Sequence, residues 1–135
     1  MRRIVIVEDD ALVAKYLKYV LDQDGRYDDV VVTESGDEVL ALARDPATVA
    51  LIVDVSLRST QLDGRYIDGL ELTRAIKADP ATAHLPVIVA TAHAMAGDRE
   101  RFLRESGADG FLRKPITDPA DVRSLIAELV GRRSD

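Results

Sequence analysis

Five short runs of apolar residues alternate along the chain with longer segments in which apolar residues recur with the period of a helix. Uninterrupted runs rich in β-branched residues are typical of strands that are buried on both faces of a sheet. Regular alternation of such strands with helices predicts parallel strands joined by right-handed crossovers, and therefore an α/β, doubly wound sheet with helices on both faces. The expected strands are residues 4–7, 30–33, 51–53, 87–90 and 110–112.

Residues that can cap helices stand at the expected helix boundaries. Asp10 can cap the first helix, and Ser35 and Asp68 are each followed three residues later by a glutamate, which is the spacing of a capping box. We therefore expect the first three helices to begin beside these residues.

The last two expected helices carry end signals of their own. Gly107 is the expected stop of the fourth helix. Asp118 and Pro119 suit the start of the fifth, because the N–H that proline lacks would be unpaired in the first turn. Gly131 is expected to end this helix in the left-handed conformation.

Length and charge narrow the class of protein. The 135 residues suit one domain, which we expect to span 1–135 with a core at about 3–131 and no output domain. A net charge of −6 argues against binding to nucleic acid or an anionic membrane. There is no cysteine for a disulfide or thiol chemistry, and no apolar stretch suits a signal peptide or membrane span, so we expect a cytoplasmic protein.

Polar residues follow four of the expected strands. Glu8 and Asp9 follow the first, Asp54 the third, Thr91 the fourth and Lys114 the fifth. The binding crevice of a doubly wound sheet lies beyond the carboxyl ends of its strands, so we expect these residues to converge. Neighbouring carboxylates repel each other unless a cation intervenes, and an all-oxygen ligand set favours Mg²⁺. The lysine and the hydroxyl could then contact a phosphoryl oxygen.

Each of these residues has a simpler explanation when it is taken alone. Acids after strands commonly cap helices, and single lysines are usually solvated. The joint occurrence of acids, threonine and lysine at one sheet edge favours a functional site.

Five motifs in order resemble the response-regulator receiver family, the CheY-like superfamily, over nearly the whole chain. Any one of them is weak alone, but five in order and at similar spacing are specific. The resemblance implies a flavodoxin-like sheet of order 2-1-3-4-5. The motifs are Val-Glu-Asp-Asp at 7–10, Val-Asp-Val at 53–55, Asp-Gly-Leu-Glu-Leu at 68–72, Ala-Thr-Ala at 90–92 and Lys-Pro at 114–115.

The resemblance also implies a single-domain response regulator of a two-component or phosphorelay system. Asp54 would accept a phosphoryl group from a histidine kinase or a histidine phosphotransfer protein. Asp9 and Asp54 would ligate Mg²⁺ directly, Glu8 would act through water, and Ser56 would contribute its backbone carbonyl. The output would be binding to an effector protein, by a monomer or a weak dimer formed through the fourth helix, fifth strand and fifth helix.

Further positions take roles from the same resemblance. Lys114 would bind a phosphoryl oxygen, and the family's cis peptide bond would precede Pro115. Thr91 would swing toward the phosphate while Phe111 turns inward, although plain core packing also explains an aromatic residue there. Ser56 and His93, placed beside the attacking water, would give slow to moderate self-dephosphorylation; a lone histidine is also common at a surface.

The stretch between Asp54 and Asp68 is about twice the family's usual length for this loop and lacks its Met-Pro turn. The pair Asp63-Gly64 predicts the tip of a small hairpin. The stretch is either a lid or partner-selecting element, with Arg58, Arg65 and Tyr66 exposed to a kinase, or a tolerated insertion, since added loop length costs only about 0.6 kcal/mol per doubling.

Two other functions compete with the switch. A Mg²⁺-dependent aspartyl-phosphate phosphatase or phosphotransferase could use the same acceptor, but the residue two after Asp54 is Ser56 and not an acid. A receiver-like scaffold that works without phosphorylation is disfavoured by the intact set of acids, threonine and lysine.

Overall fold

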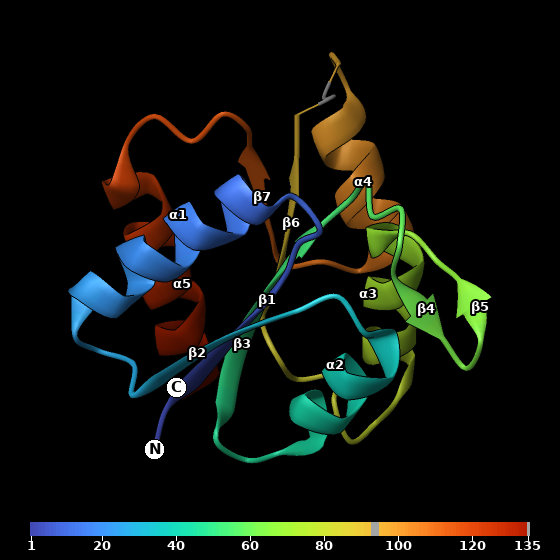
Figure 1. The fold of residues 1–135 in the computed structure, drawn as a ribbon, viewed down its shortest axis with the longest axis horizontal. Coiled ribbons are helices and arrows are strands. Elements are labelled where there is room, and N and C mark those ends of the chain that lie inside the picture. Colours follow the sequence, from blue (N-terminus) through green and yellow to red (C-terminus); the bar gives the residue numbers. More distant parts are fainter. Residues whose placement is uncertain (93–94, 135) are drawn as a thin grey trace.

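A computed structural model describes residues 1–92 and 95–134 of the chain. Its centre is a parallel sheet in the order β2-β1-β3-β6-β7 (Figure 1). This order is the predicted 2-1-3-4-5 arrangement of a flavodoxin-like fold, which is therefore confirmed. The five strands are β1 (Arg3–Val7), β2 (Asp29–Thr33), β3 (Thr48–Asp54), β6 (Val87–Thr91) and β7 (Gly110–Arg113).

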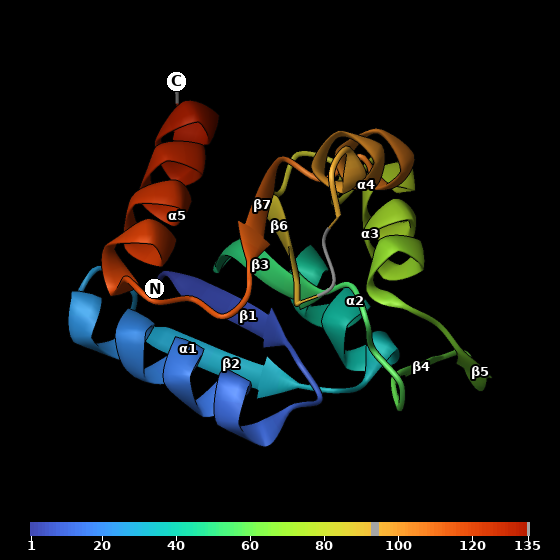
Figure 2. The ribbon, with the colours of Figure 1, turned by 90° about the horizontal axis from the view of Figure 1, so that it is seen from above.

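Helices cover both faces of the sheet (Figure 2). On one face, α1 (Ala11–Asp24) and α5 (Pro119–Ser134) enclose a core that includes Ile4 and Ile6 of β1. On the other, α2 (Gly36–Arg44) and α3 (Gly69–Ala78) enclose a second core, with α4 (Asp98–Ser106) beyond α3. Both faces of the sheet contribute to an apolar core because the strands are apolar on both faces, as the uninterrupted runs predicted.

The predicted helix starts are confirmed. The Asp10 carboxylate accepts hydrogen bonds from the amides of Leu12 and Val13, and the Ser35 hydroxyl accepts one from the amide of Glu38. At α3, Asp68 forms a complete capping box with Glu71. These bonds satisfy amides that have no partner inside the first helical turn.

The predicted end of the last helix is wrong. Gly107 does end α4, with a φ of 79°, but α5 continues past Gly131 to Ser134. The side chains of Leu129 and Val130 are buried in the first core, so packing holds the final turns in helical form. Glycine permits a left-handed stop but does not impose one.

Residues between β3 and α3 form the predicted hairpin. Its strands β4 (Gln61–Leu62) and β5 (Arg65–Tyr66) pair antiparallel. The turn residues Asp63 and Gly64 have φ values of 55° and 79°, and positive φ at both positions is what a two-residue type I′ turn requires. The hairpin lies beside α2, at the outer side of the molecule (Figures 1 and 2).

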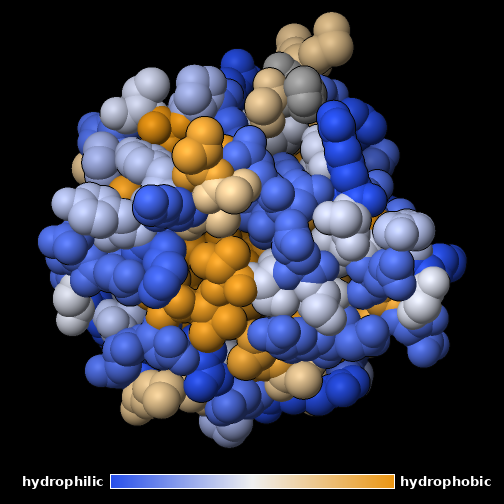
Figure 3. All heavy atoms as spheres, viewed as in Figure 1, coloured by the Kyte–Doolittle hydropathy of each residue, from blue (hydrophilic) through white to orange (hydrophobic). Residues whose placement is uncertain are grey.

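The outer surface of the molecule is largely polar. On the face shown in Figure 3, an apolar strip lies between α1 and α2, over the edge strand β2, where Val32 is 38% exposed. Among the helices in residues 1–92 and 95–134, none combines the length and the apolar character that crossing a bilayer would need.

Candidate phosphoacceptor and cation site

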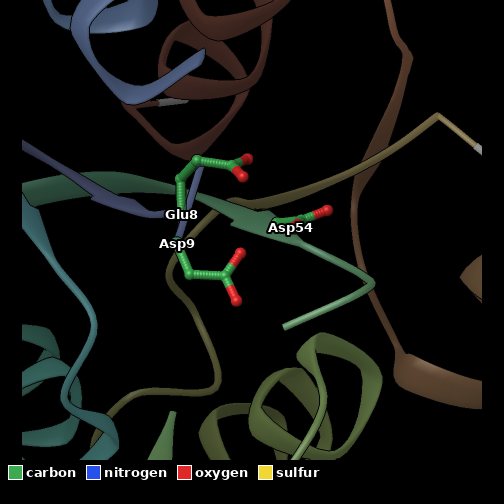
Figure 4. Close-up of side chains that lie close together, drawn as sticks. All are labelled: Glu8, Asp9 and Asp54. Carbon is green, nitrogen blue, oxygen red and sulfur yellow. The ribbon is translucent and has the colours of Figure 1, made fainter. Parts of the chain in front are cut away.

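Three carboxylates meet at the carboxyl ends of two neighbouring strands. Val7 of β1 pairs with Val53 of β3, so Glu8 and Asp9, which follow β1, lie beside Asp54, the last residue of β3. One carboxylate oxygen from each acid lies within 4.8 Å of the others. Figure 4 shows the three side chains projecting to the same side of the two strand ends.

This donor set fits a hard divalent cation. All three groups offer oxygen, which Mg²⁺ and Ca²⁺ prefer over nitrogen or sulfur. Asp54 and Glu8 are only 6% and 3% exposed, so water screens their mutual repulsion poorly. A bound cation would relieve that repulsion, and the residues present therefore fit the Mg²⁺ that the sequence predicted.

Lys114 joins two of the three acids. Its Nζ lies 2.5 Å from Oε2 of Glu8 and 3.2 Å from Oδ1 of Asp54. The Lys114 amide donates a hydrogen bond to the Thr91 carbonyl, which ties the end of β7 to the end of β6. The peptide bond between Lys114 and Pro115 is cis. The lysine therefore stands where the sequence reasoning placed a cation for phosphoryl oxygens.

The charge of Glu8 is only partly compensated. Burial raises the pKa of Glu8 above its ordinary value, the hydrogen bond from Lys114 opposes that rise, and the negative charge of Asp54 adds to it. One lysine facing three carboxylates leaves net negative charge in the cluster. A second positive charge at this position would be stabilised.

Hydrogen bonds of three main-chain amides fix the backbone around the end of β3. The Val55 amide donates to the Ala90 carbonyl, and the Gly69 amide donates to the Val55 carbonyl. The Ser56 amide donates to Oδ1 of Asp54 at 3.3 Å. These bonds hold the backbone on both sides of Asp54, whose side chain lines a cavity of about 360 Å³.

Several of the predicted site residues line that cavity together. Glu8, Asp54, Ser56 and Lys114 all contribute to its wall. Asp54 pairs with Ala90 of β6, and the next residue, Thr91, ends that strand and is buried. Asp54, Thr91 and Lys114 thus come from three adjacent strand ends.

One other predicted site residue lies away from this cavity. Phe111 of β7 is half-buried, and its ring centroid lies 6.2 Å from that of Phe102 in α4. His93 lies outside the described residues.

One residue of this site was not assigned a place in it by the sequence. Arg58, expected only as an exposed contact for a kinase, lines the same cavity as Asp54. Its main-chain N–H donates a hydrogen bond to Oδ2 of Asp9 at 2.8 Å. The sequence did hold one signal for this place. Arg58 is only four residues after Asp54, the last residue of β3, and therefore stays near the end of that strand.

Residues 4–127 match the model of the response regulator receiver domain, and the chain belongs to that family. Receiver domains of this family serve two-component signalling. The match covers the sheet, except for Arg3 at the start of β1, and every residue of the acidic cluster.

Relatives agree with this assignment. The polar-differentiation response regulator DivK of Brucella ovis is 33% identical over 124 residues, which cover 92% of this chain and 93% of that protein. The receiver domain of the sensor histidine kinase PA1611 from Pseudomonas aeruginosa superposes with a TM-score of 0.78 at 27% identity, covering 96% of this chain and 98% of that one. That structure holds a magnesium ion coordinated in its active-site cleft.

A sensor protein from Polaromonas superposes equally well. Its TM-score is 0.79 at 28% identity, and the match covers 98% of each chain. The fold is thus shared by regulators and by receiver domains of sensor proteins.

Proposed function

We propose that this chain is a single-domain response regulator in which Asp54 accepts a phosphoryl group from a phosphohistidine donor in a Mg²⁺-dependent reaction. The observation that carries the proposal is the cluster of Glu8, Asp9 and Asp54, whose oxygens lie within 4.8 Å of one another, with Lys114 in contact with two of them. A lone acid at a strand end would not need this cationic partner.

In the proposed reaction, an oxygen of Asp54 forms a bond to phosphorus. The bond between phosphorus and the donor's imidazole nitrogen breaks, and its electron pair returns to that nitrogen. Asp9, Asp54 and the Ser56 carbonyl would hold Mg²⁺, and Glu8 would hold it through water. The bound ion would neutralise charge on the phosphoryl oxygens.

Lys114 has a second contribution in this reaction. Its Nζ already lies 3.2 Å from the acceptor carboxylate, so it can stabilise the negative charge of the phosphoryl oxygens without a large movement. The catalysed step is confined to the protein's own phosphorylation and dephosphorylation.

The output is a change in a protein-binding surface. Thr91 would turn toward the phosphoryl group, and Phe111, whose ring packs near Phe102, would transmit that change to α4. The resulting surface comprises α4, β7 and α5, and it would bind an effector protein or a second copy of the chain weakly. The donor would be a histidine kinase or a histidine phosphotransfer protein in the cytoplasm, where ATP supplies the phosphoryl group.

Ser56 and His93 would set the lifetime of the phosphoryl group. Neither side chain is an acid or an amide that could hold an attacking water well, so we expect slow to moderate self-dephosphorylation. The double variant Ser56→Asn, His93→Glu should hydrolyse its phosphoryl group faster than the wild type. A wild-type half-life no longer than that of the variant would contradict this part of the proposal.

Incubation with acetyl phosphate and Mg²⁺, followed by intact mass measurement, tests the proposal. We expect a gain of one phosphoryl group that is lost in Asp54→Ala and in excess EDTA. Asp22→Ala, which removes an exposed carboxylate of α1, is the matched control and should still gain the group. No adduct on the wild type would favour the phosphorylation-independent scaffold, and turnover of a phosphomonoester would favour the phosphatase.

A further inference from the structure

The long segment between β3 and α3 is packed against the body of the domain. The side chains of Leu57 and Ile67, near its two ends, are buried in the core beneath α2 and α3. The Ile67 amide donates a hydrogen bond to the carbonyl of Thr60. Thr60 is fully buried. The base of the hairpin is therefore closed and fixed.

The tip of the hairpin is attached to α2. The Asp63 amide donates to the carboxylate of Asp37, with 3.1 Å to Oδ1. Gly36 lies so close to the hairpin that a Cβ added there would be 2.6 Å from the Gln61 carbonyl oxygen. Contacts at both base and tip make residues 56–67 a docked element, which a freely tolerated surface loop would not be.

Docking places one main-chain group beside the cation site. The N–H of Arg58 lies 2.8 Å from Oδ2 of Asp9, a residue 49 positions earlier in the chain. A bond to one oxygen restrains the orientation of the carboxylate and leaves its other oxygen for a cation. The Met-Pro turn usual in this loop of the family is absent, and a proline at position 58 would have no N–H to donate.

We propose that the main-chain N–H of Arg58 is the positioning group for Asp9 and that the docked hairpin holds it in place. The inference rests on the proposed function, because it assigns Asp9 to cation binding. Groups that hydrogen-bond to a metal ligand orient it, and losing them typically weakens metal affinity by roughly 10- to 100-fold.

Two substitutions at one position separate the N–H from the side chain. Arg58→Ala removes the guanidinium and keeps the main-chain N–H. Arg58→Pro removes both. Mg²⁺ affinity is measured for each by calorimetric titration of the metal-free protein. We expect Arg58→Pro to bind Mg²⁺ roughly 10- to 100-fold more weakly than Arg58→Ala.

Equal Mg²⁺ affinities in Arg58→Pro and Arg58→Ala would overturn the inference. A wild type that neither binds Mg²⁺ nor gains a phosphoryl group from acetyl phosphate would instead overturn the proposed function. A wild type that does both, with equal variants, would leave that function intact and remove only the role of Arg58.

Amide hydrogen exchange gives a readout that does not need a folded proline variant. In Asp9→Ala, the Arg58 amide should exchange faster than in the wild type, because its acceptor is gone. The Ile67 amide, bonded to Thr60, is the internal control and should stay protected. Unchanged protection of the Arg58 amide in Asp9→Ala would also overturn the inference.

Discussion

Two segments that follow the neighbouring strands β3 and β6 differ in how they are attached to the candidate site. Residues 56–67, after β3, bury Leu57, Thr60 and Ile67 and bond to Asp9 and α2. After β6, α4 buries the side chains of Phe102 and Ser106, and no hydrogen bond among the described residues joins it to the three acids or to α2. Elements that move in signalling are drawn from the less stable parts of a fold. We therefore expect the candidate cation site to have a firm side, residues 56–67, and a more loosely held side, α4, where the output surface is proposed.

The largest effect should come from disturbing the contact between Asp54 and the start of α3, where the firm segment ends. A Cβ added at Gly69, the first residue of α3, would lie 1.9 Å from the Asp54 carbonyl oxygen. Because backbone must shift to make room, Gly69→Ala should lower the free energy of unfolding by roughly 4 kcal/mol. Urea titration measures this.

Gly131→Ala is the control for that substitution. It adds the same methyl group in α5, where nothing lies within 4 Å, and should cost no stability. Similar losses for the two variants would show that the close approach of Gly69 to β3 has no energetic weight.

Removing the main anchor of the loose side should be the next largest effect. Phe102→Ala deletes a buried ring that packs near Phe111, and such truncations cost about 3 kcal/mol. Amide exchange should accelerate in α4 and leave residues 56–67 protected. Arg99→Ala, on the exposed side of α4, is the control and should change neither the stability nor the amide exchange of either segment. Acceleration in both segments at once would show that they are not independent.

The reverse pattern is expected when the hairpin is displaced. Gly36→Ala would place a Cβ 2.6 Å from the Gln61 carbonyl oxygen, and overpacking of this kind costs about 2 kcal/mol. Exchange should accelerate at Asp63 and Arg58 and stay unchanged in α4, because no hydrogen bond or ion pair among the described residues joins α4 to the hairpin. Unchanged exchange at both amides would mean that the hairpin does not depend on α2.

The smallest expected effect concerns pH. The pKa of Glu8 is raised in the folded protein, chiefly by burial, so protonated Glu8 favours folding at low pH and that contribution is lost as pH rises through the raised value. Relative to Glu8→Gln, the metal-free wild type should therefore lose stability as pH rises through that range. Urea titrations of both proteins at a series of pH values measure the difference, and a constant difference would contradict the raised pKa.

The strands and the convergence of the site could be predicted because their signals are local. An apolar run identifies a buried strand, and parallel strands bring Glu8, Asp54 and Lys114 to one edge whatever the details of packing. The Asp63-Gly64 turn was likewise predictable, since positive φ at both positions suits these residue types.

What the sequence did not predict depends on tertiary contacts. The hydrogen bond from Arg58 to Asp9 uses a main-chain N–H, which every residue except proline has and which therefore carries no sequence signature. The continuation of α5 past Gly131 depends on the burial of Leu129 and Val130 against a distant sheet. Local propensity does not contain either contact.

The bond between Asp37 and Asp63 has a consequence for how this domain could be engineered or could diverge. Asp37 lies in the first turn of α2, so one carboxylate serves both that helix and the tip of the hairpin. Grafting residues 56–67 alone into another receiver domain would leave the amide of Asp63 without the carboxylate of Asp37. A side chain in place of Gly36 would also collide with the grafted hairpin. The hairpin and the start of α2 should therefore be inherited, exchanged or redesigned as one unit.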